Sequence, residues 1–137
     1  MVGLEIGLLC LALNVYYEAR SESDEAQMAV ALVTRNRARY KDRTLCEEVY
    51  SPHQFSWTRQ ITCPYCKLKP PHPQDEAWIK AQLIARDSLT AKDFTKGAYW
   101  YHRYDIHPWW TWNKQKVGTW GAHVFYKCKP KFRCNWR

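Results

Sequence analysis

The sequence contains no apolar stretch long enough to cross a membrane. Its longest clean apolar run is 6–13, whereas a membrane-spanning helix needs about 20 residues. The run also lacks the features of an export signal: Glu5 precedes it without any Lys or Arg, and no small-x-small cleavage site follows. We therefore expect a helix of the mature domain, no membrane span, and synthesis in the host cytoplasm without a signal peptide.

Internal repeats and low-complexity tracts are also missing, and a length of 137 residues is typical of one domain. We expect a single monomeric catalytic domain over residues 1–137. Acidic residues are few, since 21 Lys and Arg stand against 13 Asp and Glu. The resulting net charge of +8 favours anionic partners: nucleic acid, acidic lipid or an anionic cell-wall polymer.

Aromatic residues, in contrast, are plentiful, with eight Trp and nine Tyr. A core of this size cannot hide them all, so some should line a groove and stack on flat ligand faces such as sugar rings or bases. Composition therefore leaves two classes, a carbohydrate-active enzyme and a nucleic-acid-binding module. No RNP, KH or helix-turn-helix signature supports the second class.

Apolar spacing, capping residues and prolines predict helices first and strands afterwards. Helices are expected over 4–17, 23–39, 45–50 and 75–89, and β-strands over 97–102 and 121–126. The two strands should pair across a loop that holds Pro108 and three tryptophans. Arg35, Arg37 and Arg39 should form a basic, exposed end of the second helix. Helices followed by a small antiparallel sheet predict an α+β domain.

Glu18 lies at the end of the first apolar helix, directly after Tyr16 and Tyr17. A carboxyl group against aromatic rings and an apolar wall loses hydration, which disfavours its charged form. Such a group stays protonated near neutral pH and donates a proton to a glycosidic oxygen. An ordinary helix-end Glu paired with Arg20 is the alternative interpretation of the same pattern.

Five ordered blocks stand out within about residues 12 to 126. They are Asn-Val-Tyr-Tyr-Glu-Ala-Arg-Ser-Glu at 14–22, Gln-Met-Ala-Val-Ala-Leu-Val-Thr-Arg-Asn-Arg at 27–37, Gln-Phe-Ser at 54–56, Gly-Ala-Tyr-Trp-Tyr-His at 97–102 and Gly-Ala-His-Val-Phe-Tyr at 121–126. In order and residue type these blocks resemble the SleB-type cell-wall hydrolase family of spore cortex-lytic enzymes. The resemblance implies a lysozyme-like, lytic-transglycosylase-like fold, cleavage of the glycan strands of peptidoglycan, and Glu18 as the catalytic residue. Tyr17 and Ser21 depart from the family pattern, which usually has glycine at both positions.

The type of glycosidase stays open between muramidase and lytic transglycosylase. A glycosidase with two working carboxylates would need a second acid facing Glu18. Candidates are Glu22, Asp24, Glu25, Asp93 and Asp105. Glu22 and Asp24 have a simpler role as acids at a helix start. A lytic transglycosylase needs one Glu, which protonates the leaving oxygen and then takes the proton of the muramyl 6-hydroxyl. Without a peptidoglycan-binding repeat, the chain better suits a phage endolysin or virion lytic enzyme.

Further residues are expected to bind the glycan. Polar groups at 54–56 suit sugar hydroxyls or the N-acetyl group, and Pro108 fixes the backbone before a Trp pair in a loop. Strand alternation places Tyr101 and His102 on opposite faces, and His123 is alternatively a core histidine. The full set of expected substrate-binding residues is Tyr17, Gln54, Phe55, Ser56, Tyr101, His102, Trp109, Trp110 and His123.

Cysteine chemistry and the basic tail complete the expectations. Cys10, in the apolar run, should be a buried thiol. Cys63, Cys66, Cys128 and Cys134 leave disulfides, free thiols and a structural zinc site open, and zinc is not favoured because the two pairs are far apart. We expect no required cofactor and no catalytic metal. The basic tail 127–137 should contact the anionic cell envelope after release of the protein. The alternative function is a non-enzymatic, basic, Trp-rich module that binds nucleic acid or glycan and holds zinc with its cysteines.

Overall fold

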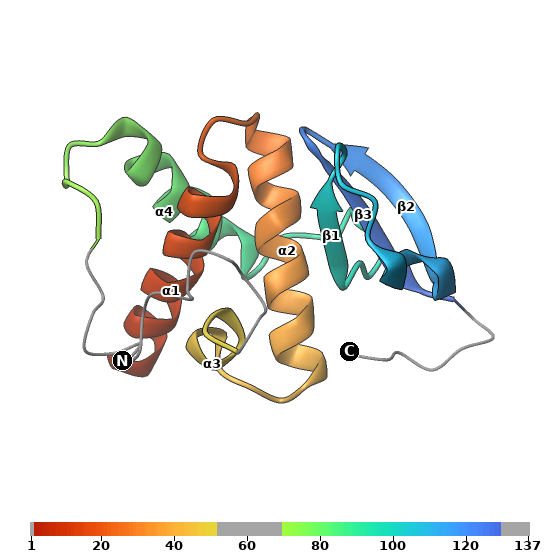
Figure 1. Cartoon of the computed structure of the whole chain (residues 1–137). Coiled ribbons are helices and arrows are strands. Elements are labelled where there is room, and N and C mark those ends of the chain that lie inside the picture. The colour runs from red at the N-terminus through yellow and green to blue at the C-terminus, as the bar shows by residue number, and fades with distance from the viewer. Residues whose placement is uncertain (1, 52–69, 130–137) are drawn as a thin grey trace.

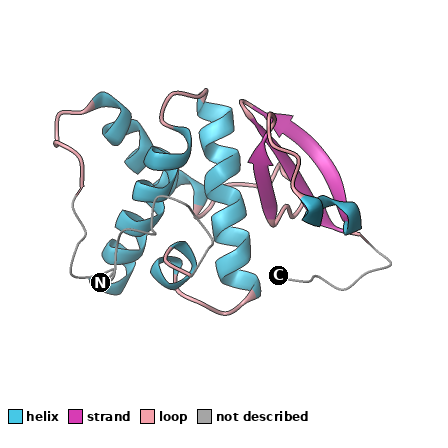
Figure 2. Cartoon of the chain, in the orientation of Figure 1, coloured by secondary structure: helices cyan, strands magenta, loops and turns pink. Residues whose placement is uncertain are grey.

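The computed structural model describes residues 2–51 and 70–129. Helices lie on one side of the domain and a small sheet on the other, with α2 between α1 and the sheet (Figures 1 and 2). The elements are α1 (Val2–Ala19), α2 (Asp24–Tyr40), α3 (Leu45–Val49), α4 (Glu76–Ser88), β1 (Trp100–Arg103), the 3-10 helix η2 (Trp109–Asn113), β2 (Lys114–Trp120) and β3 (His123–Cys128). The four helices predicted from sequence are confirmed, each within two residues at either end.

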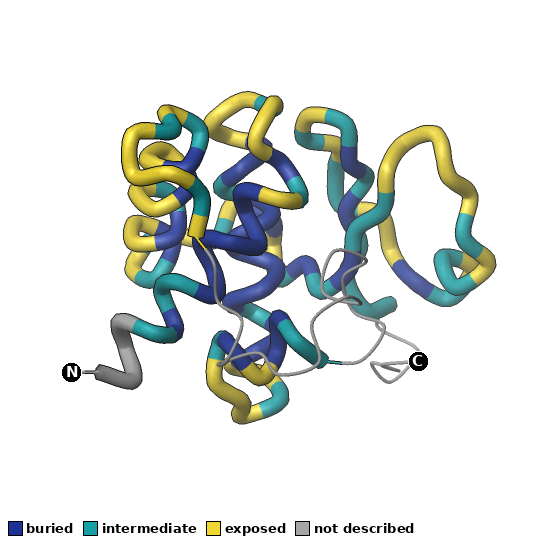
Figure 3. The backbone as a smooth tube through the Cα atoms, turned by 60° about the vertical axis from the view of Figure 1, so that its left-hand side comes forward, coloured by how far each residue is buried: buried dark blue, intermediate teal, exposed yellow. Residues whose placement is uncertain are grey.

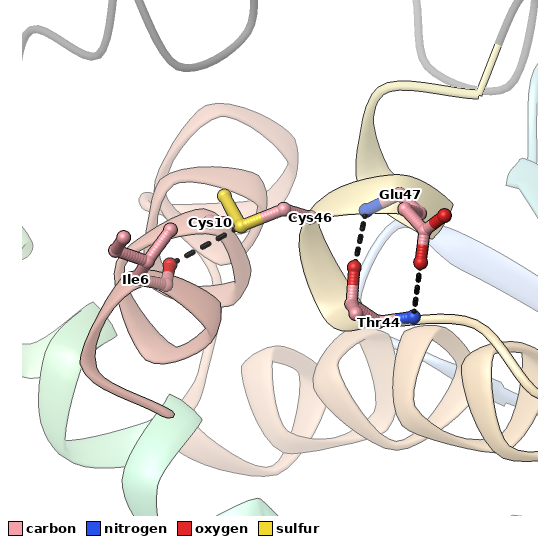
Figure 4. The surroundings of a disulfide bond; sticks show 5 residues. All are labelled: Ile6, Cys10, Thr44, Cys46 and Glu47. Carbon is pink, nitrogen blue, oxygen red and sulfur yellow. Dashed lines mark hydrogen bonds between the residues drawn. A yellow bond between two sulfur atoms is a disulfide. The ribbon is translucent and has the colours of Figure 1, made fainter. Parts of the chain in front are cut away.

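Local side-chain caps explain where the helices begin. The Ser23 side chain accepts a hydrogen bond from the Ala26 N–H and opens α2, and the Asp75 carboxylate accepts two N–H groups at the start of α4. Thr44 and Glu47 form a reciprocal capping box before α3 (Figure 4). These bonds satisfy N–H groups that have no partner within the helix, which is why short polar residues at these positions set the boundaries.

The sheet has the order β1-β3-β2, with both neighbours antiparallel to β3. The predicted pairing of 97–102 with 121–126 is confirmed by the register, in which Tyr101 lies opposite Phe125. The prediction that a loop joins these two strands is wrong in one respect, because the segment between β1 and β3 contains η2 and the strand β2. This strand is an edge strand, is rich in polar residues and has a register shift between Lys116 and Gly118. These features weaken the alternation that identifies a strand in sequence.

The core runs from the α1–α4 contact through α2 to the inner face of the sheet. Leu11 and Val15 of α1 are fully buried in the helical part, and Phe125 of β3 packs with Val30 and Val33 of α2. Buried positions accordingly follow α1 and α2 along their length (Figure 3). The sheet is thus fixed against α2 by apolar contacts on one of its faces.

A disulfide bond joins Cys10 of α1 to Cys46 of α3, with the two Cα atoms 5.2 Å apart (Figure 4). The expectation of a buried thiol at Cys10 is therefore wrong, although the residue is fully buried as expected. Nothing local marks the pair, because Cys10 and Cys46 are 36 residues apart and meet only when α3 packs on α1. Cys128 is disulfide-bonded as well.

Arg35 and Arg37 near the end of α2 are buried, which corrects the expectation that they are exposed, whereas Arg39 is exposed as expected. Arg35 donates to the carbonyl oxygens of Ser88 and Ala91 at 2.7 and 2.8 Å. Arg37 is paired with fully buried Glu48, with 2.8 Å between Nε and Oε2. Both guanidinium groups therefore connect α2 to other elements, and burial lowers the pKa of each.

Candidate active site

Glu18 lies in the last turn of α1 and is partly buried. Burial raises the pKa of its carboxyl group to about 7, and the nearby negative charge of Glu22 acts in the same direction. Desolvation penalises the charged form of a carboxyl group, and a like charge adds to that penalty. A side chain with this pKa can both donate and accept a proton near neutral pH. The expected desolvation of Glu18 agrees with this environment, and its role as a proton donor stays a prediction.

Glu22 lies in the loop between α1 and α2, next to the turn between β2 and β3. Its Oε1 accepts a hydrogen bond from the Ala122 N–H at 2.6 Å, and its Oε2 lies 3.2 Å from Nδ1 of His123. The side chain is 12% exposed. The expected role of Glu22 as a helix-start acid is therefore wrong, because its carboxylate faces the sheet. In Figure 1 the α1–α2 loop and the β2–β3 turn meet at the same end of α2.

Gly121 makes the approach of Glu22 to this turn possible. Its φ angle is +59°, a conformation that side chains rarely adopt, and a Cβ atom there would overlap Oε1 of Glu22. The same Cβ would lie 2.8 Å from Cβ of Ala26. Glycine is thus required at this position for two independent reasons, the backbone conformation and the space that the carboxylate occupies.

Tyr101 and His123 meet on the face of the sheet that packs against the helices. Their rings lie 5.0 Å apart, and Tyr101 also contacts Phe125. Burial, followed by the charge of Glu18, raises the pKa of the Tyr101 hydroxyl well above its usual value. Burial lowers the pKa of His123, although Glu22 opposes that change. Tyr101 therefore lies near Glu18, whereas His123 is buried behind Tyr101 and beside Glu22, and the part of both residues in substrate binding stays a prediction.

His102 and Trp110 lie on the other face of the sheet. Nε2 of His102 is 2.9 Å from the hydroxyl of Tyr126, and the Trp110 ring contacts both side chains. Alternation along β1 directs His102 away from the helices and from Tyr101. Trp109 is 76% exposed at the start of η2. His102, Trp110 and Tyr126 thus form an aromatic group on the face of the sheet away from the helices. The part of His102, Trp109 and Trp110 in glycan binding stays a prediction.

The remaining expected residues have different placements. Tyr17 is 46% exposed in the last turn of α1, next to Glu18 in sequence, with its ring against Tyr16. Gln54, Phe55 and Ser56 lie outside the described residues, and so do Cys63, Cys66 and Cys134. The sequence reasoning missed the role of Glu22, and no local pattern would have revealed it, because its partner Ala122 is 100 residues away.

Metal binding has little support in the part of the chain that the structure describes. Within residues 2–51 and 70–129, no group of three or more His, Cys, Asp or Glu side chains is placed to hold a metal ion. Cys128, one of four cysteines considered for zinc, is disulfide-bonded. Zinc is bound by the thiolate form of cysteine, which a disulfide does not offer. In the same ranges, no helix combines the length and apolar character needed to cross a membrane.

Comparison with known proteins gives consistent results. The model of the cell wall hydrolase family matches residues 21–126, a range that starts after Glu18 and includes Glu22, Tyr101 and His123. The structure is similar to the catalytic domain of the germination-specific lytic transglycosylase SleB from Bacillus anthracis, with 25% identity, coverage of 89% of this chain and 94% of that chain, and a TM-score of 0.69.

A second similar structure is the catalytic domain of the Bacillus cereus SleB protein. The sequences are 24% identical, the match covers 90% of this chain and 91% of that chain, and the TM-score is 0.70. No curated protein matches the chain. The two structural likenesses confirm the expected α+β, lytic-transglycosylase-like fold.

Proposed function

The chain belongs to the cell wall hydrolase family, and from this premise we propose that it cleaves the glycan strands of peptidoglycan with Glu18 as the catalytic acid and base. The observation that carries the proposal is the partly buried Glu18 carboxyl group, whose pKa is raised to about 7. At neutral pH a substantial share of the molecules then holds the proton that the reaction requires. A fully exposed Glu would be almost entirely ionised.

The finer proposal is that the enzyme is a lytic transglycosylase. In the first step protonated Glu18 donates its proton to the glycosidic oxygen, and the bond between that oxygen and C1 of the muramyl sugar breaks. In the second step the Glu18 carboxylate accepts the proton of the C6 hydroxyl of the same sugar, whose oxygen bonds to C1. The product is a 1,6-anhydro ring, no water is consumed, and Glu18 ends protonated as it began.

The state of the other carboxylates supports a mechanism with one working acid. Both oxygens of Glu22 are engaged, by the Ala122 N–H and by His123. Asp93 accepts hydrogen bonds from Asn36, from Thr95 and from the Gly97 N–H. Asp24 pairs with Lys80, and Asp105 pairs with Arg103. A muramidase of the two-carboxylate type needs a second acid free to activate water or attack the sugar. Four of the five candidates thus have a partner, and the fifth, Glu25, is exposed in the first turn of α2.

Peptidoglycan is the partner that this proposal requires. The charge of Glu18 acts on the Tyr101 hydroxyl, and Tyr101 contacts the ring of buried His123, so these two side chains form the wall behind Glu18. Trp109, exposed at the start of η2, offers an indole face for stacking on a more distant part of the glycan. The basic tail 127–137 would add attraction to the anionic wall. A zinc-holding nucleic-acid-binding module is less favoured, because Cys128 is disulfide-bonded.

The site of action proposed here is the cell wall, outside a reducing cytosol. The Cys10–Cys46 disulfide and the disulfide-bonded state of Cys128 support this location, because disulfides persist in oxidising compartments. An endolysin or a virion lytic enzyme, which reaches the wall from the host cytoplasm, would meet this condition.

Mass spectrometry of the products tests the reaction type. Purified peptidoglycan is digested with the enzyme, and the released muropeptides are weighed. Anhydromuramyl ends would support the lytic transglycosylase, whereas reducing muramyl ends, heavier by one water, would show a muramidase. Release of neither kind of end would overturn glycan cleavage itself.

A further inference from the structure

Glu22 is held in place along its main chain. Its N–H donates to the carbonyl oxygen of Ala19 at 3.0 Å, and its carbonyl accepts from Nε2 of fully buried Gln27 at 3.1 Å. Ala19 closes the helical turn that carries Glu18. The main chain of Glu22 therefore keeps a constant position relative to Glu18.

The carboxylate of Glu22 is held just as firmly. The Ala122 N–H fixes Oε1, Nδ1 of His123 faces Oε2, and Gly121 leaves the space that the carboxylate fills. The contact with His123 becomes an ion pair only when the imidazole is protonated. A residue used only to connect the loop to the turn would not need its charge, since a neutral amide oxygen accepts the same N–H.

The charged and titratable groups around Glu22 and His123 come from four elements. Glu18 lies on α1, Tyr101 and Arg103 lie on β1, and His123 lies on β3. The Arg103 side chain is paired with Asp105, and its positive charge interacts electrostatically with Glu22. Arg37 of α2 acts on Tyr101 and is itself paired with Glu48.

His123 decides how strongly the charge of Glu22 reaches Glu18. A protonated imidazole at 3.2 Å would cancel much of that charge. Burial lowers the pKa of His123, so the imidazole is mostly neutral at neutral pH. The negative charge of Glu22 then acts on Glu18 and opposes its ionisation.

We propose that Glu22 is a positioning residue for the reaction: clamped by the Ala122 N–H, His123 and the Cβ-free turn at Gly121, it keeps a fixed negative charge beside Glu18 and so maintains Glu18 in its proton-donating form. This inference rests on the proposed function of Glu18. It gives Glu22 an electrostatic role and excludes it as a second carboxylate that touches the substrate.

The test is the pH profile of Glu22→Gln. The amide keeps an acceptor for the Ala122 N–H but removes the charge. Glu18 must be protonated to act as the acid, so kcat/KM falls as pH rises above its pKa. Without the charge of Glu22 that pKa falls, and the alkaline limb of the profile should move to lower pH. We expect a shift of roughly half a unit, which is about a threefold loss of kcat/KM on the alkaline side. Activity at the acidic end of the profile should stay near that of the wild type.

Asp24→Asn is the matched control. Asp24 is also an acid in this region, but it is 70% exposed and paired with Lys80. Its variant should leave the profile in the wild-type position. A Glu22→Gln profile that is lowered equally at all pH values, or that does not move, would overturn the inference. If Glu18→Gln retained activity, the proposed function would fail instead, so the two failures are distinguishable.

A measurement on the wild type covers the case in which Glu22→Gln does not fold. In carbon-13 NMR of the glutamate carboxyl groups, the Glu22 signal should show a small second step at the pH where Glu18 titrates. Glu18→Gln should abolish that step. The carboxyl signal that is missing from the spectrum of this variant is then assigned to Glu18. A Glu22 signal without the step would show that the two carboxyl groups do not sense each other, and the inference would be wrong.

Discussion

At the scale of single residues, the environment of Glu18 is set by two effects of the same sign. Burial of the last turn of α1 removes water from the carboxyl group, and the clamped carboxylate of Glu22 adds repulsion. Tyr101 and His123 complete the surroundings from the inner face of the sheet. Replacing Glu18 by Gln removes the titrating group with almost no change of shape, so the same variant reports on catalysis and on stability.

Glu18→Gln should abolish cleavage while the fold is kept. The amide cannot deliver a proton, and general acid–base catalysis contributes about 10²–10⁴-fold to a rate. A turbidity assay on purified peptidoglycan should therefore show a loss of at least about 10²-fold. Activity within a few-fold of the wild type would exclude Glu18 as the catalyst.

The same variant should be more stable than the wild type at alkaline pH. The pKa of Glu18 is about 7 in the folded state, above the ordinary value of about 4.3 in an unfolded chain. The folded state thus binds more protons between these values, and stability falls as pH rises through this window. Above about pH 7 the ionised Glu18 carboxylate destabilises the folded protein by the full amount, and below about pH 4 this destabilisation is absent.

Melting curves of Glu18→Gln and the wild type at about pH 4 and about pH 8, on either side of this window, check this sign. The variant should melt higher at the alkaline pH, and the difference should vanish at the acidic one. An equal difference at both pH values would mean that the amide changes packing rather than titration.

At the scale of elements, the turn between β2 and β3 connects the sheet to the end of α1. Ala122 donates to Glu22 in the α1–α2 loop, and Gly121 provides the conformation and the space for that contact. The Cys10–Cys46 disulfide makes a comparable connection between α1 and α3. Both connections hold α1, which carries Glu18, against elements distant in sequence.

Gly121→Ala should both destabilise the protein and move the alkaline limb of its kcat/KM profile to lower pH. The left-handed backbone costs a non-glycine residue about 1–2 kcal/mol, and the new Cβ would also displace Oε1 of Glu22. Gly97→Ala is the matched control. Gly97 has a φ angle of +82°, but a Cβ atom added to it would have no neighbour within 4 Å among the described residues.

Thermal melting and kcat/KM against pH are measured for both variants. Both should lose stability from backbone strain, and Gly121→Ala should lose more. The alkaline limb should move only in Gly121→Ala. Equal effects of the two substitutions would show that contact with Glu22 contributes nothing beyond strain.

At the scale of the whole molecule, basic residues are concentrated at the C-terminal end of the sequence, and an aromatic group lies on the face of the sheet away from the helices. The net charge is +8, and the tail from Lys127 onward holds five cations without an acid. The aromatic group of His102, Trp110 and Tyr126 lies on the outer face of the sheet. We expect both features to hold the enzyme on the wall rather than to act in the chemical step.

Neutralising the tail should therefore reduce wall adsorption more than turnover. The five cations to change are Lys127, Lys129, Lys131, Arg133 and Arg137. Binding to purified walls should weaken at low salt and change little at high salt, because ions screen long-range attraction beyond about 10 Å at about 0.1 M. Turnover of short soluble glycan fragments should stay near the wild-type value. The opposite result, intact wall binding with lost turnover on fragments, would assign the tail to catalysis.

Several properties of this protein were determined by the sequence alone, because the interactions responsible are local. Ser23, Thr44 with Glu47, and Asp75 cap helices through bonds to residues two or three positions away. The apolar length of α1 and the aromatic residues before Glu18 likewise indicated a desolvated acid at a helix end. The aromatic, β-favouring residues over 97–102 and 121–126 predicted the pairing of β1 with β3.

Only the tertiary structure decided what distant residues do. Glu22 meets Ala122 across 100 residues, Cys10 meets Cys46 across 36, and Arg37 meets Glu48 in the interior rather than at an exposed end. Alternation had placed Tyr101 and His102 on opposite faces, and the packing of the sheet on α2 decided that Tyr101 is the one that faces the helices. Each of these outcomes depends on how helices and sheet pack together, and a residue's own neighbours in sequence carry no record of that packing.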